Sequence, residues 1–383
     1  MNKESAYWIA LAHLPRWGYL KTNKLIIKFF HEYKLSIEDF FQLSENDWET
    51  QYGLEYKEVE DLKKAKLELV NNAFLAETLY NEGYELIPIT SPLYPKTLKD
   101  NLKAAHSPAL LYVKGNKQIM QEKSIAIVGS RNASDKSLEF TDNIAKLASK
   151  EYKVVVSGFA KGVDKQALDS AIKYKGQSII VLPQGIMTFS SGFKKYYKQI
   201  VDGDVLVLST FPPKVPWKVE LAMARNPIIY GLASEIYVAE SSDKGGTWSG
   251  VIDGLRKNRK IYVRKPDANE NIANNLLIQQ GAIAVDFDGN PLTDYKPTLS
   301  EVNKSNVKSN VNEPNENYEN KIFDLLKTGE YTVKEIIKKL QLTWSEKKLR
   351  DYLKSQKEVE TINKKPLRFT MKNSTVKQIS LFK

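Results

Sequence analysis

The 383-residue sequence contains no cysteine and only three histidines. Without cysteine the chain can form neither a disulfide nor a thiolate centre, so nothing in it requires an oxidising compartment. The histidines, His13, His31 and His106, do not belong to any cluster with metal-ligand spacing. These absences argue against thiol catalysis and the common zinc sites, and we expect no metal, no cofactor and no catalytic residue.

Long hydrophobic runs are also missing from the sequence. No stretch of about 18 apolar residues is present to cross a bilayer. The first apolar stretch is interrupted by Pro15 and Arg16, which is unlike a signal peptide. The sequence therefore predicts a cytoplasmic protein without a membrane segment.

Positive charge is in excess, with 57 Lys and Arg against 46 Asp and Glu and a formal net charge of +11. Most of the excess lies near the C-terminus, where residues 318–383 hold 16 Lys and Arg against 8 Asp and Glu. This balance favours a polyanionic partner, either nucleic acid or an acidic membrane surface. A lysine-rich composition that only serves solubility is the alternative interpretation.

Residues 1–83 predict a small helical domain of the SAM or helix-hairpin-helix type, because apolar residues recur there at helical spacing. Ser36 with Asp39 three residues later has the pattern of a capping box, which marks a helix start. One longer helix is expected from about residue 56 to residue 80. Residues 1–83 contain no recognisable catalytic pattern.

From residue 84 to residue 293 the pattern predicts an α/β domain. Short β-branched runs alternate with amphipathic segments, and most runs lack polar alternation, which indicates strands buried on both faces. We therefore expect an extended Rossmann-like, doubly wound and mostly parallel sheet. The predicted strands are 85–89, 109–113, 124–129, 152–158, 178–182, 204–208, 235–240, 260–263 and 282–286, and the predicted helices are 135–150, 164–175, 217–225, 247–258 and 269–280.

A flexible linker is expected over residues 294–317, which hold six Asn, two Pro and no aromatic residue after Tyr295. Residues 318–383 then predict three helices followed by a basic hairpin, the plan of a winged helix. Thr332 is the expected cap of the second helix, and Thr343 or Ser345 that of the third. Such a domain can read duplex DNA or dock a protein, as an adaptor would, and the sequence leaves both open.

Three loops that follow predicted strands combine glycine with a cation or a hydroxyl group. Ligands of an open parallel sheet bind at the carboxyl ends of its strands, and backbone N–H groups that enter a helix attract anions. We therefore predict a phosphate-binding rim, with Asp164 also a candidate helix cap. The predicted binding residues of these loops are Gly129, Ser130, Arg131, Ser157, Gly158, Lys161, Gly162, Asp164, Lys244 and Gly245.

Several motifs in this order resemble those of the DNA-processing protein A family (DprA, also called Smf). They are VGSR (128–131), SGFAKGVD (157–164) and ARNPIIYGL (224–232), preceded by the family-like segment 91–116. The resemblance implies an extended Rossmann fold that binds single-stranded DNA, forms a homodimer and hands DNA to a RecA-type recombinase during natural transformation. It also implies that Arg131 contacts phosphate, that Arg225 and Asn226 bind DNA, and that the protein is not an enzyme.

The chain departs from the family pattern at several positions. Pro227 replaces the second Arg of the third motif, Lys244-Gly245-Gly246 replaces Lys-Ser-Gly, and Lys265-Pro266 replaces Pro-Gly. The segment between Leu182 and Val205 also differs. Its lysines, Lys194, Lys195 and Lys198, are predicted to compensate for lost positive charge. These differences indicate a divergent branch of the family.

Two questions stay open from the residues alone. Aromatic side chains in or beside the loops are candidates either for stacking on bases or for filling the core; they are Phe159, Phe193, Tyr196, Tyr197 and Trp248. The alternative function is a nucleotide sensor or nucleotide hydrolase, since DKGGTW (243–248) resembles a Gly-Gly-Thr nucleotide loop. The helix expected after it offers Asp253 but no Glu, and the chain has no Walker motif.

Overall fold

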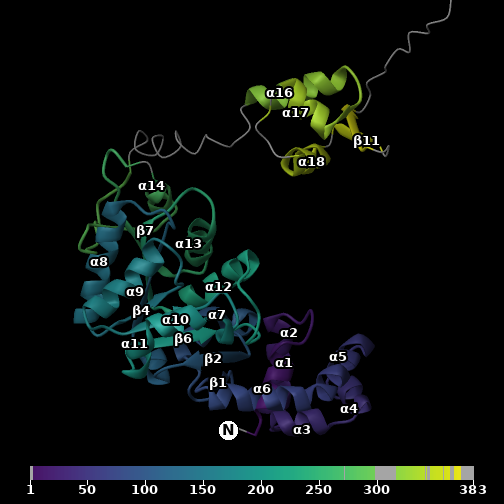
Figure 1. Cartoon of the computed structure of the whole chain (residues 1–383), viewed down its shortest axis with the longest axis vertical. Coiled ribbons are helices and arrows are strands. Elements are labelled where there is room, and N and C mark those ends of the chain that lie inside the picture. Colours follow the sequence, from purple (N-terminus) through teal and green to yellow (C-terminus); the bar gives the residue numbers. More distant parts are fainter. Residues whose placement is uncertain are drawn as a thin grey trace, which may run out of the picture. The chain divides into compact units, whose positions relative to one another are not determined.

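The computed structural model describes residues 3–270, 272–297, 316–340, 342, 346–356, 358–362 and 366–371. The chain forms two compact units, residues 1–308 and residues 309–383 (Figure 1). Within the described residues no helix is both long enough and apolar enough to cross a bilayer.

The first unit begins with a group of short helices. Ser36 caps one of them through the predicted capping box, in which its hydroxyl accepts from the Asp39 N–H and the Asp39 carboxylate accepts from the Ser36 N–H. The single helix expected over residues 56–80 is instead two helices that meet at Glu68, whose φ of −83° and ψ of 0° interrupt the α-helical path. The helices are α1 (Ser5–Ala12), α2 (Tyr19–Ile26) with the π-turn η1 (Ile27–Glu32), α3 (Ile37–Gln42), α4 (Glu45–Thr50), α5 (Tyr56–Leu67) and α6 (Leu69–Asn81).

A nine-stranded sheet of the order β1-β2-β6-β5-β4-β3-β7-β8-β9 forms the centre of this unit. All nine predicted strands are present, which confirms the doubly wound and mostly parallel sheet. The strands from β6 to β9 in this order are parallel, and β2 pairs antiparallel with both β6 and β1. The strands are β1 (Glu85–Pro88), β2 (Leu110–Lys114), β3 (Ser124–Gly129), β4 (Val154–Ser157), β5 (Ser178–Val181), β6 (Val205–Ser209), β7 (Glu235–Glu240), β8 (Lys260–Arg264) and β9 (Ile283–Val285).

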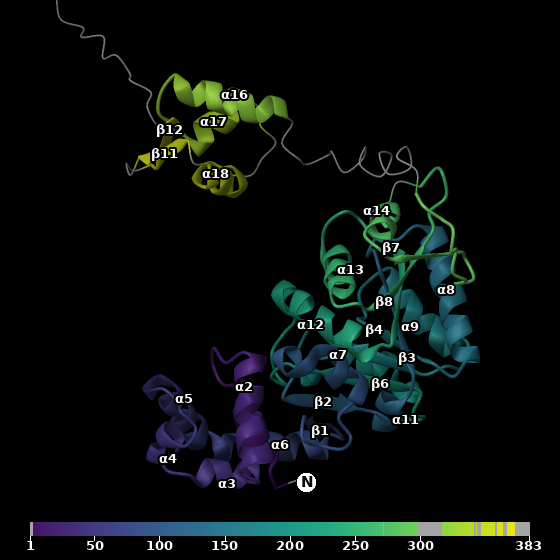
Figure 2. The ribbon, with the colours of Figure 1, turned by 180° about the vertical axis from the view of Figure 1, so that it is seen from behind.

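Helices cover both faces of the sheet, as expected for strands without polar alternation. Strand β3 shows why, since Ile125 and Ile127 pack into one apolar core while Ala126 and Val128 pack into another. Figure 1 shows α8 and α9 over one face, and Figure 2 shows α12 and α13 over the other. The helices are α7 (Lys96–His106), η2 (Lys117–Gln121), α8 (Asp135–Lys150), α9 (Val163–Lys173), η3 (Ile186–Thr188), α10 (Ser190–Lys195), α11 (Tyr197–Val201), α12 (Val219–Leu232), α13 (Gly246–Arg256) and α14 (Asn274–Gln279).

The strand order reverses between β3 and β7. From β3 the chain first adds β4, β5 and β6 on one side, and it later adds β7, β8 and β9 on the other. Successive helices therefore leave β3 and β7 toward opposite faces, which opens a crevice at the carboxyl ends of these two strands. This crevice is where the topology places a ligand site.

A partly buried histidine joins the N-terminal helices to the sheet. His13 follows α1, and its Nε2 lies 2.8 Å from the hydroxyl oxygen of Tyr112 on β2, with the two rings stacked at a centroid distance of 5.8 Å. Burial lowers the pKa of His13 from 6.5 to about 4, because the charged imidazolium would be taken out of water. The neutral ring is thus the form that fits this contact.

Acidification is expected to destabilise the protein through His13. The folded-state pKa lies below the unfolded value, so the unfolded chain binds the extra proton first. Stability is then fully present above about pH 6.5 and falls by up to about 3 kcal/mol as the pH drops toward 4. Urea unfolding measured between pH 7 and pH 4 tests this. His13→Gln, which does not titrate, should show a flatter profile, and an equally steep one would contradict the assignment.

In its described residues the second unit has three helices and a small antiparallel sheet of the order β10-β12-β11. Thr332 caps its second helix as predicted, since its hydroxyl accepts from the Glu335 N–H and its own N–H donates to the Glu335 carboxylate. The other predicted cap, Thr343 or Ser345, lies outside the described residues, as does most of the predicted linker. The arrangement fits a winged helix. Its elements are α16 (Glu316–Lys327), β10 (Tyr331–Thr332), α17 (Val333–Leu340), α18 (Glu346–Ser355), β11 (Val359–Ile362) and β12 (Arg368–Met371).

Candidate nucleic-acid interface

A cleft of about 390 Å³ opens at the carboxyl ends of β3 and β7, where the strand order reverses. The loop after β3 and the loop after β7 form part of its lining, and α12 forms another part. The site is thus in the place that an open parallel sheet provides for ligands.

Hydrogen bonds hold the loops after β3 and β7 together. The Ser130 N–H donates to the carbonyl of Glu240 at 3.0 Å, and the Thr247 hydroxyl donates to the carbonyl of Gly129 at 3.1 Å. Helix α13 begins at Gly246, directly after the second loop, and Gly245 precedes it with a φ of +92°. The first N–H groups of α13 have no partner within the helix and so add positive potential beside this loop.

The loop after β4 supports the Arg131 loop from the side. Gly162 has a φ of +75°, and the Val163 N–H that follows it donates to the Ser130 carbonyl at 3.2 Å. A Cβ atom on Gly162 would lie 2.3 Å from that carbonyl oxygen and 2.7 Å from the carbonyl oxygen of Arg131. Only glycine therefore allows the two loops to approach this closely.

Asp164 does not cap a helix, so that prediction was wrong. The N-cap of α9 is Gly162, and the buried Asp164 carboxylate accepts from the backbone N–H groups of Gly158 and Ala160. Burial raises the pKa of Asp164, and the charge of Arg225 opposes the shift. The Ser157 hydroxyl donates to the Asp164 carbonyl at 2.6 Å. Both residues therefore shape the loop after β4.

Arg225 is the unusual residue of the cleft. It is 3% exposed, and its Nε and Nη1 atoms have no hydrogen-bond partner. Burial lowers the pKa of the Arg225 guanidinium, while the charge of Asp164 opposes that shift. A Cβ atom on Gly158 would lie 1.5 Å from Nη1, so glycine there makes room for the guanidinium. Buried donors without partners are rare in proteins, and this cation carries two of them beside the cleft that it lines.

The electrostatics of the cleft favour an anion with several oxygen atoms. The described residues that line it include three cations, Arg131, Arg225 and Lys244, but only one carboxylate, that of Asp164. Guanidinium groups bind phosphate through paired hydrogen bonds, and an ammonium group adds a point charge. The cleft therefore has the chemistry of a phosphate site.

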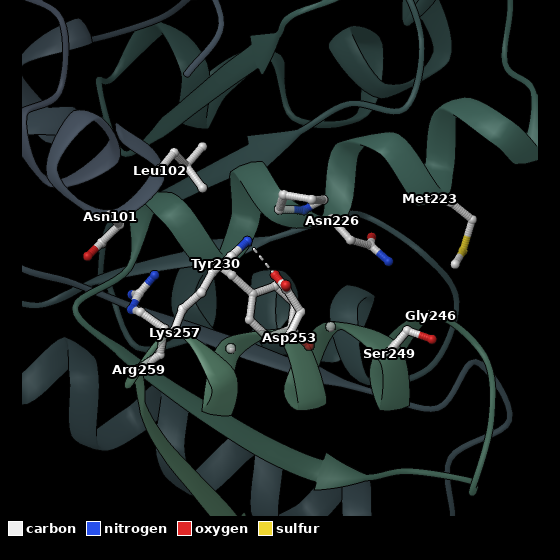
Figure 3. Close-up of a pocket in the computed structure, with 13 residues that line it drawn as sticks. Asn101, Leu102, Met223, Asn226, Tyr230, Gly246, Ser249, Asp253, Lys257 and Arg259 are labelled. Atoms are coloured by element: carbon white, nitrogen blue, oxygen red, sulfur yellow. Dashed lines mark hydrogen bonds and ion pairs between the residues drawn. The ribbon is translucent and has the colours of Figure 1, made fainter. Parts of the chain in front are cut away.

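A second, smaller pocket of about 160 Å³ adjoins the cleft between α12 and α13 (Figure 3). Four residues line both spaces, so the two spaces adjoin: Met223, Asn226, Tyr230 and Gly246. Figure 3 shows an ion pair of 2.7 Å between Asp253 and Lys257 on the α13 side of this pocket. A ligand in the cleft can thus extend along α12.

Comparison with known proteins identifies the family. The family model described as DNA recombination-mediator protein A matches residues 85–294, which is more than half of the chain. The DNA processing protein DprA of Bacillus subtilis is 30% identical over 211 residues, covering 53% of this chain and 69% of its own. That of Streptococcus pneumoniae is 29% identical over 211 residues, covering 54% and 73%.

The chain belongs to the DNA recombination-mediator protein A family. Its fold agrees with this assignment. An X-ray structure of the DprA protein from Streptococcus pneumoniae superposes with a TM-score of 0.61 at 23% identity, covering 74% of this chain and 95% of that one. The predicted family membership is thus confirmed.

Within this family member, eight of the twelve predicted binding residues line the cleft: Gly129, Ser130, Arg131, Asp164, Arg225, Asn226, Lys244 and Gly245. Three of the others are Ser157, Gly158 and Gly162, which lie at the end of β4 and in the loop after it. That segment contacts Arg225 and the Arg131 loop. Lys161 has an exposed side chain and is not part of the lining. Of the three cations predicted for the phosphate-binding rim, Arg131 and Lys244 line the cleft and Lys161 does not. Arg225 is the third cation of the cleft lining.

The aromatic residues expected near the loops mostly fill the core. The Phe159 ring lies edge-on to Phe189 at 5.1 Å and to Tyr196 at 5.7 Å, and Phe193 packs against Phe189 at 5.4 Å. Trp248 is partly buried, and Tyr197 is exposed on α11, outside the cleft lining.

The lysines expected to replace lost charge do not reach the cleft either. Lys194 and Lys195 are on α10 and Lys198 is on α11, and none of them lines the cleft. Lys195 instead lies 3.8 Å from the carboxylate of Asp169.

Sequence reasoning missed Val219, Met223 and Tyr230, all of which line the cleft. The predicted helix stopped at residue 225, but α12 continues through Pro227 to Leu232. Proline within a helix removes one hydrogen bond, here that to the Met223 carbonyl, and burial of the following turn outweighs this loss. The apolar spacing of Ile228, Ile229 and Leu232 was the available signal for the longer helix.

Proposed function

We propose that this chain binds single-stranded DNA, with phosphates of the strand in the cleft at the ends of β3 and β7. The observation that carries the proposal is the buried Arg225, whose Nε and Nη1 atoms have no partner and which lines the same cleft as Arg131 and Lys244. A phosphate would supply the missing acceptors and balance the excess charge.

A polynucleotide suits the site better than a free nucleotide. The cleft adjoins a second pocket along α12, and the net charge of the whole chain, +11, favours a polyanion as the partner of the protein. Phosphate contacts of this kind give an affinity that falls linearly with salt on logarithmic axes. Titration of the protein with single-stranded and duplex oligonucleotides at several salt concentrations tests the proposal. Turnover or tight binding of a mononucleotide would instead favour the nucleotide sensor or hydrolase.

Arg131→Ala is expected to weaken binding of single-stranded DNA by about 1–3 kcal/mol, because one charge-assisted contact is lost. The salt dependence should become shallower by about one phosphate contact. The Arg131 side chain is exposed, so the circular dichroism spectrum should not change. Lys161→Ala is the matched control, since this cation is in a neighbouring loop but outside the cleft lining. An equal effect of both substitutions would argue against a localised site.

We further propose that the protein acts by binding and not by catalysis, as a cytoplasmic homodimer that hands DNA to a RecA-type recombinase. The family description, recombination-mediator protein, supports this role. Recombinase filament formation on coated single-stranded DNA, measured with and without this protein, tests it. A protein that binds the strand but does not accelerate filament formation would retain the binding function and lose the mediator function.

A further inference from the structure

Exposed apolar side chains gather where α12 begins. Trp217 is 49% exposed, Val219 57% and Met223 47%. Val219 and Met223 are four residues apart and so lie on one face of the helix. Both line the phosphate cleft, and Trp217 precedes Val219 by two residues. We call these three residues the apolar ledge of the cleft.

The ledge is held in place by its surroundings. The segment before Trp217 is fixed by the Gly185 N–H, which donates to the Val215 carbonyl at 2.8 Å. Figure 3 shows the Met223 side chain extending from α12 toward the loop that carries Gly246. Met223 also lines the adjoining pocket, so the ledge borders both spaces. Two of its three residues, Val219 and Met223, thus line the cleft that the three cations also line.

Trp217 is well placed among the exposed aromatic residues. Large aromatic side chains with substantial exposure in the described residues are Tyr33, Tyr56, Phe74, Tyr80, Tyr152, Tyr197 and Trp217. Of these, Trp217 is the one within two residues of a residue that lines the cleft. Phe159, in the loop after β4, is partly buried and packs edge-on against Phe189 and Tyr196.

We propose that the apolar ledge is a nucleobase-stacking subsite, on which Trp217 and Met223 receive bases of the strand whose phosphates occupy the cleft. The inference rests on the proposed function. Tryptophan gives the largest aromatic face and methionine a polarizable thioether, and both favour contact with a flat base. Stacking accepts every base because each has a π-face.

This subsite would also explain a preference for single strands. In a duplex the base faces are stacked on one another, whereas an unpaired strand can turn them toward the protein. The cleft lining combines cations, which suit the phosphate of a nucleotide, with apolar side chains, which suit its base. Binding to single-stranded nucleic acid commonly combines these two elements.

The test compares two strands with the same phosphates. Oligothymidylate and an abasic strand of equal length are titrated, by fluorescence anisotropy, against the full-length protein and its variants. Trp217→Ala should weaken binding of oligothymidylate about tenfold or more, the usual effect of losing one stacking ring. Binding of the abasic strand and the slope against salt should stay unchanged, since no phosphate contact is lost. Trp217→Phe should restore most of the affinity.

Phe74→Ala is the matched control, because it removes a similarly exposed aromatic ring from α6, among the N-terminal helices. An unchanged affinity of Trp217→Ala for oligothymidylate, with Arg131→Ala still weakened, overturns the ledge and leaves the proposed function intact. Equal weakening on both strands also overturns it, because the residue would then act on the backbone. If the native protein binds neither strand, the proposed function fails as well.

Discussion

Arg225→Met is expected to yield a protein that is more stable than the native one and that binds single-stranded DNA at least tenfold more weakly. The native guanidinium is 3% exposed and leaves Nε and Nη1 without partners. Buried donors without acceptors cost about 1–3 kcal/mol. Burial lowers the pKa of Arg225 despite the attraction of the Asp164 charge, so the cost of desolvation is the larger of the two effects. The substitution removes this cost, and the free energy of unfolding should rise by about 1–3 kcal/mol.

The loss of affinity in Arg225→Met has a separate cause. The proposed phosphate in the cleft would accept from the Arg225 guanidinium, so the variant loses a charge-assisted contact. Asp164 keeps its hydrogen bonds from the Gly158 and Ala160 N–H groups and stays in place. Urea unfolding measures the stability, and anisotropy titration with an oligonucleotide measures the affinity.

Arg131→Met is the matched control for this prediction. Arg131 lines the same cleft but is exposed, so its replacement should weaken binding without a gain in stability. Lower stability of Arg225→Met would show that the guanidinium serves the fold, and the interpretation of a cation held for a ligand would then be wrong.

Gly162→Ala is expected to destabilise the protein by about 3 kcal/mol or more, a large effect for the addition of one methyl group. Two costs combine. The backbone at Gly162 has φ +75° and ψ −129°, a conformation that alanine rarely adopts. The new Cβ atom would also lie 2.3 Å from the Ser130 carbonyl oxygen. Because that carbonyl belongs to the Arg131 loop, the affinity of the folded variant for single-stranded DNA should also fall.

Gly53→Ala separates the two costs. Gly53 has a φ of +68°, and a Cβ atom there would meet no other atom within 4 Å. Only the backbone cost of about 1 kcal/mol is then expected, with no change in DNA binding. Urea unfolding of the two variants side by side gives the difference. If both lose the same stability, the close contact between the two loops does not exist in solution.

The two predictions concern one structural feature, the use of glycine to bring backbone and cations close together. Gly158 leaves room for the Arg225 guanidinium, and Gly162 lets the loop after β4 touch the loop after β3. The first glycine places a charge and the second places the loop that carries Arg131. Together they position two of the three cations of the cleft, Arg225 and Arg131.

The sequence by itself determined the elements and the type of sheet. All nine strands were predicted, and α8 has the predicted bounds of Asp135 and Lys150. Such features follow from local patterns, because a continuous β-branched run indicates a strand buried on both faces and an amphipathic period indicates a helix. The glycine-bearing loops at strand ends could be predicted for the same reason, since the residue types of a turn are local.

Only the tertiary structure decided which residues meet. Arg225 lies against Gly158, and Thr247 bonds to Gly129, across separations of 67 and 118 residues. It also excluded Lys161 from the cleft lining and turned the Asp164 carboxylate to the backbone N–H groups of the loop before α9. It carried α12 through Pro227, which brings Tyr230 to the site. The physical reason is that these contacts depend on strand order and on packing against distant segments, and neither leaves a pattern within a short stretch of sequence.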